Sequence, residues 1–270
     1  MKSRTFDDLF PSKKPLIGCV HLMPLPGSPS YDGDRKIIYE KALEEVAIFN
    51  KYKLDGLIIE NFRDKPFFPD NIPAETIASL AAIGREIKRE VEVPLGINAL
   101  RNDAGAALAI ATSIGAEFIR VNVHVGAAVS EQGVLQGESH KTLRLRKKLK
   151  STVLIFADVD VKHAKPLVDR GLPEETKDLT ERGKADAIIV SGSRTGLEAK
   201  LEDLQVVKSN THLPVLIGSG LTPDNISEFY SEADGFVVGS YFKEEGKAEN
   251  FVDESRVKLM RERFNALKSE

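Results

Sequence analysis

Polar and charged residues end several of the short apolar runs in this sequence, and they are the first candidates for chemistry. A buried charge without a partner is costly, so a core that only packed would not contain them. We therefore predict a site at these run ends, with six candidate catalytic residues: Glu60, Asn98, Asn122, His124, Asp158 and Lys162.

The fifth apolar run shows how such residues reach one place. Side chains in a strand alternate between two faces. One face of this run carries, in order, Leu154, Phe156, Asp158, Asp160 and Lys162. That face changes from apolar to charged toward its C-terminal end, which is where barrel enzymes place their active sites.

The residue types allow more than one chemistry. Asp158 and Asp160 could act as a general base or as ligands for a hard divalent cation such as Mg²⁺. Lys162 could stabilise a developing anion or form a Schiff base. His124 could carry protons near neutral pH. Arg120 either joins this site or forms a structural ion pair with Glu60 or Asp158.

His21 ends the first run, where a hydrogen-bonded histidine at a strand end is the simpler interpretation.

Two glycine-bearing segments near the C-terminus, residues 217–221 and 237–240, predict an anion site. Each follows an apolar run, and glycines there let a ligand approach backbone N–H groups. Such loops match the phosphate site that a (β/α)₈ barrel builds after its seventh and eighth strands. The predicted phosphate contacts are Gly192, Ser193, Gly218, Ser219, Gly220, Gly239 and Ser240. Tight turns without a ligand are the alternative.

Eight apolar runs alternate with eight amphipathic segments, and together they must position these residues. The runs are 16–21, 54–60, 94–98, 117–123, 152–159, 186–190, 214–217 and 234–238. The segments of helical period are 35–52, 74–91, 102–114, 138–150, 173–183, 200–209, 223–231 and 253–267. This alternation predicts an α/β fold, a single-domain (β/α)₈ TIM barrel of the phosphate-binding type. A doubly wound sheet is less favoured because no Gly-x-Gly-x-x-Gly follows a strand.

No linker composition divides the chain, so residues 1–270 are expected to form one domain with a short N-terminal extension, 1–14. The segment 126–137 is predicted to be irregular, either a mobile lid or an ordered surface loop. The basic run 141–150 is predicted to be the solvated face of a barrel helix, with Leu145 and Leu149 one turn apart. Docking on an anionic membrane surface or an acidic partner is the alternative.

Composition narrows the classes of function. A net charge of -3 gives no reason to expect nucleic acid as a partner. One cysteine, Cys19, excludes a disulfide within the chain and fits a cytoplasmic location. No transmembrane segment or signal peptide is visible, and neither a Walker A motif nor Gly-x-Ser-x-Gly occurs.

Five motifs resemble the BtpA/SgcQ family. They are GCVHLMPLPGS at 18–28, DGLIIENF at 55–62, GIN at 96–98, EQGVLQG at 131–137 and SGSRTG at 191–196. The resemblance runs from about residue 8 to residue 265 and implies a phosphate-binding TIM barrel. In that family the founding cyanobacterial member is a peripheral thylakoid protein needed for photosystem I accumulation, and other members are expected to be enzymes. The resemblance supplies no catalytic residue set.

These observations predict a barrel that binds a small phosphorylated metabolite, either a sugar phosphate or a nucleotide-like compound. Lyase or isomerase chemistry fits acid–base residues without a redox-cofactor motif, and a cation such as Mg²⁺ is the one cofactor suggested. The alternative is a non-catalytic assembly or stability factor for a membrane protein complex, as in photosystem I biogenesis. A homo-oligomer is compatible with the sequence.

Overall fold

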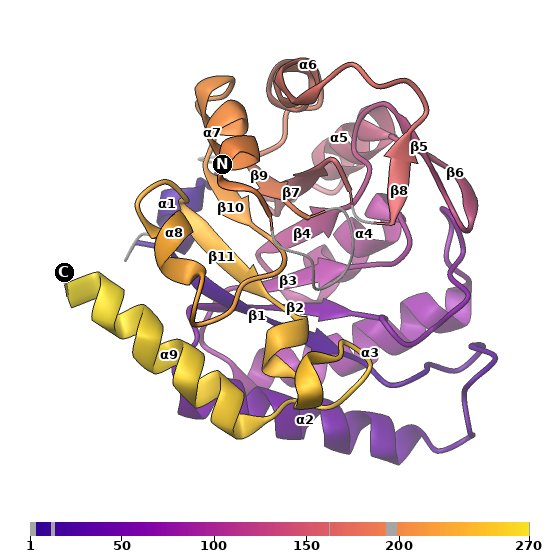
Figure 1. The fold of residues 1–270 in the computed structure, drawn as a ribbon. Helices are drawn as coiled ribbons and strands as arrows, with labels where there is room; N and C mark the ends of the chain where they lie inside the picture. The colour runs from indigo at the N-terminus through magenta and orange to yellow at the C-terminus, as the bar shows by residue number, and fades with distance from the viewer. Residues whose placement is uncertain (1–3, 12–13, 162, 193–198, 270) are drawn as a thin grey trace.

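Eight parallel strands close into a barrel in a computed structural model, which describes residues 4–11, 14–161, 163–192 and 199–269 (Figure 1). Around the barrel the order is β1-β11-β10-β9-β7-β4-β3-β2. The strands are β1 Leu16–His21, β2 Gly56–Glu60, β3 Leu95–Asn98, β4 Phe118–Val121, β7 Leu154–Val159, β9 Ala187–Val190, β10 Val215–Ile217 and β11 Gly235–Val238. The predicted α/β barrel is confirmed, and the eight apolar runs are its strands.

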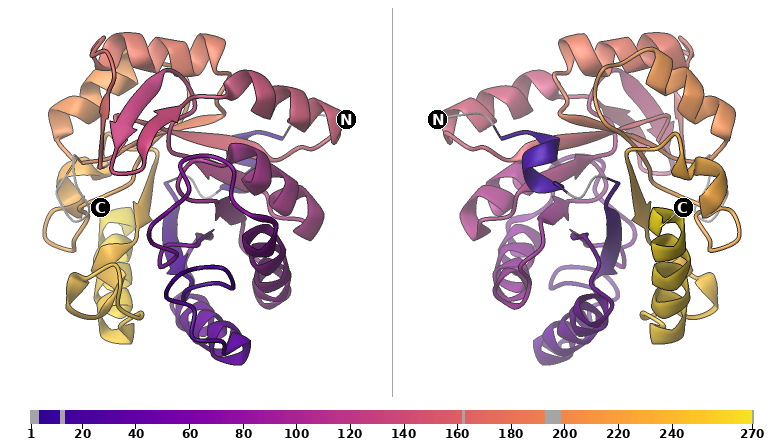
Figure 2. Two further views of the ribbon diagram at one scale, coloured as in Figure 1. Left: turned by 90° about the vertical axis from the view of Figure 1, so that its right-hand side faces the viewer. Right: turned by 90° about the vertical axis from the view of Figure 1, so that its left-hand side faces the viewer.

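Helices follow the strands and cover the outside of the barrel (Figures 1 and 2). They are α2 Arg35–Lys51, α3 Ala74–Glu90, α4 Ala104–Ile114, α5 Ser139–Lys148, α6 Leu172–Lys177, α7 Leu201–Ser209, α8 Ile226–Tyr230 and α9 Glu254–Ser269. A π-helical turn, Asp178–Arg182, continues α6. The Asp34 and Asp103 side chains accept hydrogen bonds from first-turn N–H groups of α2 and α4, which explains where these helices begin. Within the described residues, no helix has the length and apolar character to cross a membrane.

The basic run lies largely on the exposed surface of α5, as predicted, but its two leucines differ. Leu145 packs against the core, whereas Leu149 follows the helix and is 38% exposed.

A short N-terminal helix closes the bottom of the barrel. The sequence predicted only an extension here, but the chain forms the helix α1 (Phe6–Leu9) at this end of the barrel (Figure 2). Phe6 and Phe10 pack against the aromatic interior. The Phe6 ring centroid lies 5.7 Å from that of Phe156, and Phe10 lies 6.3 Å from Phe118. These contacts keep water out of the strand ends opposite the site.

The segment 126–137 is not irregular, so that prediction is wrong. It forms β5 (Ala127–Ser130) and β6 (Gly133–Gln136), which join β8 (Ala164–Pro166) in a small antiparallel sheet. Ala128 and Leu135 are buried against Val123 and Val161. The third strand comes about 30 residues later in the chain, and local sequence gives no sign of that pairing. A role as a lid stays a prediction.

We predict that Phe10→Ala lowers the free energy of unfolding by about 3 kcal/mol, because Phe10 is 2% exposed and its loss leaves a cavity under the barrel. Urea unfolding followed by circular dichroism measures the change. Phe68→Ala is the control, since Phe68 is 53% exposed. Equal effects of the two variants would show that α1 does not support the barrel.

Candidate functional site

The C-terminal ends of the barrel strands open into a cavity of about 520 Å³. Four of the predicted catalytic residues line it: Glu60, Asn98, Asn122 and Asp158. They come from β2, β3, the end of β4 and β7, and strand parity turns all four inward. Gly218, Ser219, Gly220, Gly239 and Ser240 line the same cavity from the loops after β10 and β11. The structure thus brings the predicted polar cluster and most of the predicted phosphate loops together.

Arg120 links two carboxylates on the cavity floor, those of Glu60 and Asp158. Its Nε and Nη2 lie 3.1 and 3.0 Å from the two oxygens of Asp158, a bidentate pair, and its Nη1 lies 3.5 Å from Glu60 Oε1. Burial alone would lower the pKa of Arg120, but the Asp158 and Glu60 carboxylates outweigh it and raise the pKa above its ordinary value. The contacts of Arg120 are therefore those of a structural ion pair, with both Glu60 and Asp158 as partners.

Both oxygens of Asp158 are occupied. Besides the two Arg120 contacts, Asp158 Oδ2 accepts a hydrogen bond of 2.8 Å from Asn122 Nδ2. The Asp158 side chain is 0% exposed. This arrangement suits a carboxylate that orients Arg120, and the role of Asp158 as a general base stays a prediction.

Glu60 has one oxygen engaged and one turned to a histidine. Its Oε1 accepts a 2.9 Å bond from Asn98 Nδ2, while its Oε2 lies 3.6 Å from His21 Nε2. The His21 ring stacks on Phe62 at a centroid distance of 4.3 Å, and its Nδ1 is 2.8 Å from Ala248 O. The hydrogen bond expected of a histidine at a strand end is present. His21 also lines the cavity, which the sequence did not predict.

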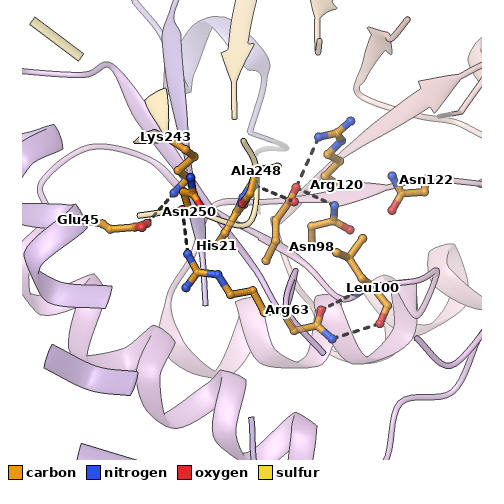
Figure 3. Close-up of polar contacts among 12 residues, drawn as sticks. His21, Glu45, Arg63, Asn98, Leu100, Arg120, Asn122, Lys243, Ala248 and Asn250 are labelled. Carbon is orange, nitrogen blue, oxygen red and sulfur yellow. Dashed lines mark hydrogen bonds and ion pairs between the residues drawn. The ribbon is translucent and has the colours of Figure 1, made fainter. Parts of the chain in front are cut away.

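The segment between β11 and α9 that carries Ala248 is held from outside the cavity (Figure 3). The fully buried Lys243 ammonium lies 2.8 Å from Glu45 Oε2 on α2, and burial lowers the Lys243 pKa while Glu45 opposes that shift. Arg63 donates to the backbone oxygens of Glu249 and Asn250, both at 2.9 Å. These contacts fix the carbonyl that orients His21.

His124 does not share the cavity of the other candidates. Its Nε2 bonds Gly183 O at 2.8 Å, beside the π-helical turn, and it is 1% exposed. Val123 and Val125 flank it next to the small sheet. The chain turns after β4, so strand parity no longer predicts direction there. A catalytic role for His124 has no support from its contacts.

Asp160 is exposed and lies beside a neighbouring groove rather than in the cavity. Partial desolvation by the walls of the groove, then the charges of Asp203 and Asp169, raise the pKa of Asp160. Among the described residues no three His, Cys, Asp or Glu side chains are grouped so that they could hold a metal ion. The suggestion that Asp158 and Asp160 bind Mg²⁺ stays a prediction.

Two of the backbone N–H groups predicted to contact phosphate already have acceptors within the protein. Gly192 N–H donates to Ser219 Oγ, and Gly218 N–H donates to Val190 O at 2.8 Å. Gly218 is explained by packing, because a Cβ there would lie 2.3 Å from Ile189 Cγ2. Gly239 differs, since a Cβ there would meet no atom closer than 3.5 Å. Lys162 and Ser193 lie outside the described residues.

Sequence reasoning missed further charged residues at the cavity, among them Arg101 and Glu131. Arg101 lines it from the loop after β3, and burial lowers its pKa while Asp158 and Glu131 oppose that shift. Glu131 reaches the same cavity from the turn of the β5–β6 hairpin. Arg101 follows Asn98 by three positions, and its place just after a strand is the signal that could have found it.

We predict that Asp158→Asn lowers the free energy of unfolding by about 3 kcal/mol, because it leaves Arg120 buried with a weakened partner. Chemical denaturation at pH 7 measures the change. Asp160→Asn, two positions on and exposed, should change stability by less than about 0.5 kcal/mol. Equal stability of both variants would contradict the ion network.

Because His124 is buried, we predict that the free energy of unfolding depends on pH. Burial lowers its pKa below 6.5, so the unfolded chain binds its proton more readily than the folded chain. Its contribution is present above pH 6.5 and is lost as the pH falls below that value. His124→Gln should flatten the decline in the free energy of unfolding between pH 7 and pH 5, and the exposed His140→Gln should not. Parallel curves for His124→Gln and the parent would contradict this.

Solved structures share the fold at low sequence identity. The phosphoribosylanthranilate isomerase of Pyrococcus furiosus superposes with a TM-score of 0.57 at 16% identity, over 94% of this chain and 99% of that chain. The thiamine phosphate pyrophosphorylase of the same organism gives 0.58 at 15% identity, over 94% and 96%. These similarities show a shared TIM-barrel architecture.

Sequence relatives are much more similar. An uncharacterized protein of Pyrococcus furiosus is 44% identical over 96% of this chain and 98% of its own length. The photosystem I biogenesis protein BtpA of Synechocystis is 42% identical over 92% of this chain and 87% of its own length. An uncharacterized mitochondrial protein of Caenorhabditis elegans is 35% identical over 96% of both. The model of the BtpA family matches residues 12–266, and the chain belongs to that family.

Proposed function

We propose that this barrel binds a small phosphorylated metabolite in the cavity at the C-terminal ends of its strands. The observation that carries the proposal is that one cavity combines a glycine-bearing wall with a floor of charged side chains. The loops after β10 and β11 bring Gly220, Gly239 and Ser240 to one wall, and the Glu60–Arg120–Asp158 network forms the floor. The phosphate would lie on the glycine wall, with the reacting end of the ligand on the floor.

The backbone, rather than an excess of positive side chains, would hold the phosphate. Among the described residues the basic side chains lining the cavity are Lys65, Arg101, Arg120 and Lys247, and the acidic ones are Glu60, Glu131, Asp158 and Glu249. The formal charges of the four basic and four acidic side chains therefore cancel. Ser240 begins a 3₁₀ turn, Ser240–Phe242, whose first N–H groups have no partner within the turn. Gly220, with φ of +69°, adopts a left-handed conformation that favours glycine.

The structural neighbours support the ligand class by analogy of fold. They include a phosphoribosylanthranilate isomerase, a thiamine phosphate pyrophosphorylase and a 3-keto-L-gulonate-6-phosphate decarboxylase. Each name includes a phosphorylated compound, and each chain shares this barrel. Lyase or isomerase chemistry is the reaction class we propose, because the cavity holds acid–base side chains at its floor.

An assembly factor is the second candidate, favoured by the 42% identity to the Synechocystis protein named for photosystem I biogenesis. Such a role does not need a ligand cavity. The volume of about 520 Å³ lies in the range of small-molecule sites, and side chains do not fill it. This volume makes ligand binding the first choice.

We expect Gly239→Val to weaken binding of a phosphorylated ligand at least tenfold, because the new side chain enters the wall on which the phosphate lies. A Cβ at Gly239 would meet no atom closer than 3.5 Å, so there is room for a side chain, and circular dichroism checks that the variant folds. A thermal-shift screen of sugar phosphates and nucleotides finds the ligand, and calorimetry measures its Kd. Gly218→Val is unsuitable because it would clash with Ile189.

The control is Gly105→Val in α4, where a Cβ meets only ordinary contacts away from the cavity. This variant should keep the parent affinity. If no phosphorylated compound binds, or Gly239→Val binds as tightly as the parent, the proposed site is wrong. The assembly-factor candidate would then become the first choice.

A further inference from the structure

A histidine and a carboxylate face each other at the ends of neighbouring strands β1 and β2. His21 Nε2 lies 3.6 Å from Glu60 Oε2, both side chains are buried to about 95%, and both line the cavity. We propose that His21 and Glu60 share one proton at neutral pH and form the acid–base pair of this site. The catalytic part of this inference rests on the proposed function, whereas the shared proton rests on geometry alone.

The contact with Ala248 determines where one ring hydrogen lies. His21 Nδ1 is 2.8 Å from Ala248 O, and a carbonyl oxygen only accepts hydrogen bonds. Nδ1 therefore carries a hydrogen. In the neutral ring Nε2 would then be an acceptor, facing the acceptor oxygen of a carboxylate. One further proton, on Nε2 or on Glu60 Oε2, turns this repulsion into a hydrogen bond or an ion pair.

Glu60 is better placed than Asp158 to exchange that proton. Glu60 Oε1 accepts from Asn98 at 2.9 Å and faces Arg120 Nη1 at 3.5 Å, which leaves Oε2 directed at His21. Both oxygens of Asp158 are taken up by Arg120 and Asn122. The proton-transfer role predicted for Asp158 is therefore better supported for the His21–Glu60 pair.

The other charged groups around the pair have partners of their own. Lys65 pairs with Glu249, and Lys247 pairs with Glu245. Arg120, the cation on the Glu60 side, is shared with Asp158. Cys19, on the same strand as His21, His163 and Tyr241 are further titratable groups that line the cavity among the described residues. The ion pair that the structure describes at His21 Nε2 is the one with Glu60.

The pair also lies where a ligand would reach it. A Cβ built on Gly239 would be 3.5 Å from His21 Nε2, so the imidazole borders the proposed phosphate wall. Stacking on Phe62, with an interplanar angle of 14°, fixes the ring plane. As an acid, His21 Nε2 would give its proton to the ligand and become neutral. Taking a proton from a second ligand atom would restore the imidazolium and complete an isomerisation without net proton loss.

The shared proton is tested by nuclear magnetic resonance on the whole chain labelled with ¹⁵N-histidine and ¹³C-glutamate. At pH 7 we expect either two protonated nitrogens in the His21 ring or a protonated Glu60 carboxyl group. In Glu60→Gln the His21 ring should become the neutral Nδ1–H form. His124 is the matched control, because it also bonds a backbone carbonyl but does not line the cavity of Glu60, and its signals should not change.

A neutral His21 ring beside an ionised Glu60 in the parent protein would overturn the inference, and so would His21 signals unchanged by Glu60→Gln. With a ligand from the phosphate screen, Glu60→Gln and His21→Gln should each lower turnover by about 10²-fold and change Kd by less than about threefold. Full turnover in either variant would also overturn it. Failure of every phosphorylated compound to bind would overturn the proposed function alone, because the resonance result does not depend on it.

Discussion

The desolvated contact between Arg120 and two carboxylates is the constraint around which the rest of the site is organised. Removing a guanidinium and two carboxylates from water is expensive, and it is tolerated here because each guanidinium nitrogen faces a carboxylate oxygen and both oxygens of Asp158 accept hydrogen bonds. Asn98 and Asn122 supply the remaining hydrogen bonds, one to each carboxylate. The network therefore fixes the orientation of four strand ends at once, which a set of apolar side chains would not do.

The network divides the two carboxylates into unlike groups. Asp158 is fully engaged and acts as the counter-ion of Arg120, whereas Glu60 keeps one oxygen toward His21. The two carboxylates on the barrel floor are thus held in different ways. This difference arises from the number of donors that reach each carboxylate, since both side chains are buried.

The segment after β11 gives the site its second support. Lys243 and Glu45 form an ion pair deep between α2 and this segment, and Glu45 also accepts from Val252 N–H. The pair holds a stretch of chain with little regular structure, and that stretch presents Gly239 to the cavity and Ala248 to His21. At the opposite end, Phe6 and Phe10 close the barrel. The cavity therefore opens only on the side that carries the loops after the strands, within the part of the chain described.

The sequence alone determined the eight-strand barrel, the rim of polar residues and the glycine loops, because hydrophobic period and strand parity are local properties of the chain. Parity correctly turned Glu60, Asn98, Asn122 and Asp158 inward, and it failed at His124, where the strand had ended. Tertiary structure decided which partner each group met. The bond between His21 and Ala248 joins residues 227 positions apart, and β5 finds β8 only after a helix and a barrel strand have intervened. Neither pairing leaves a periodic trace in the sequence, because each depends on how the closed barrel brings distant loops to one end.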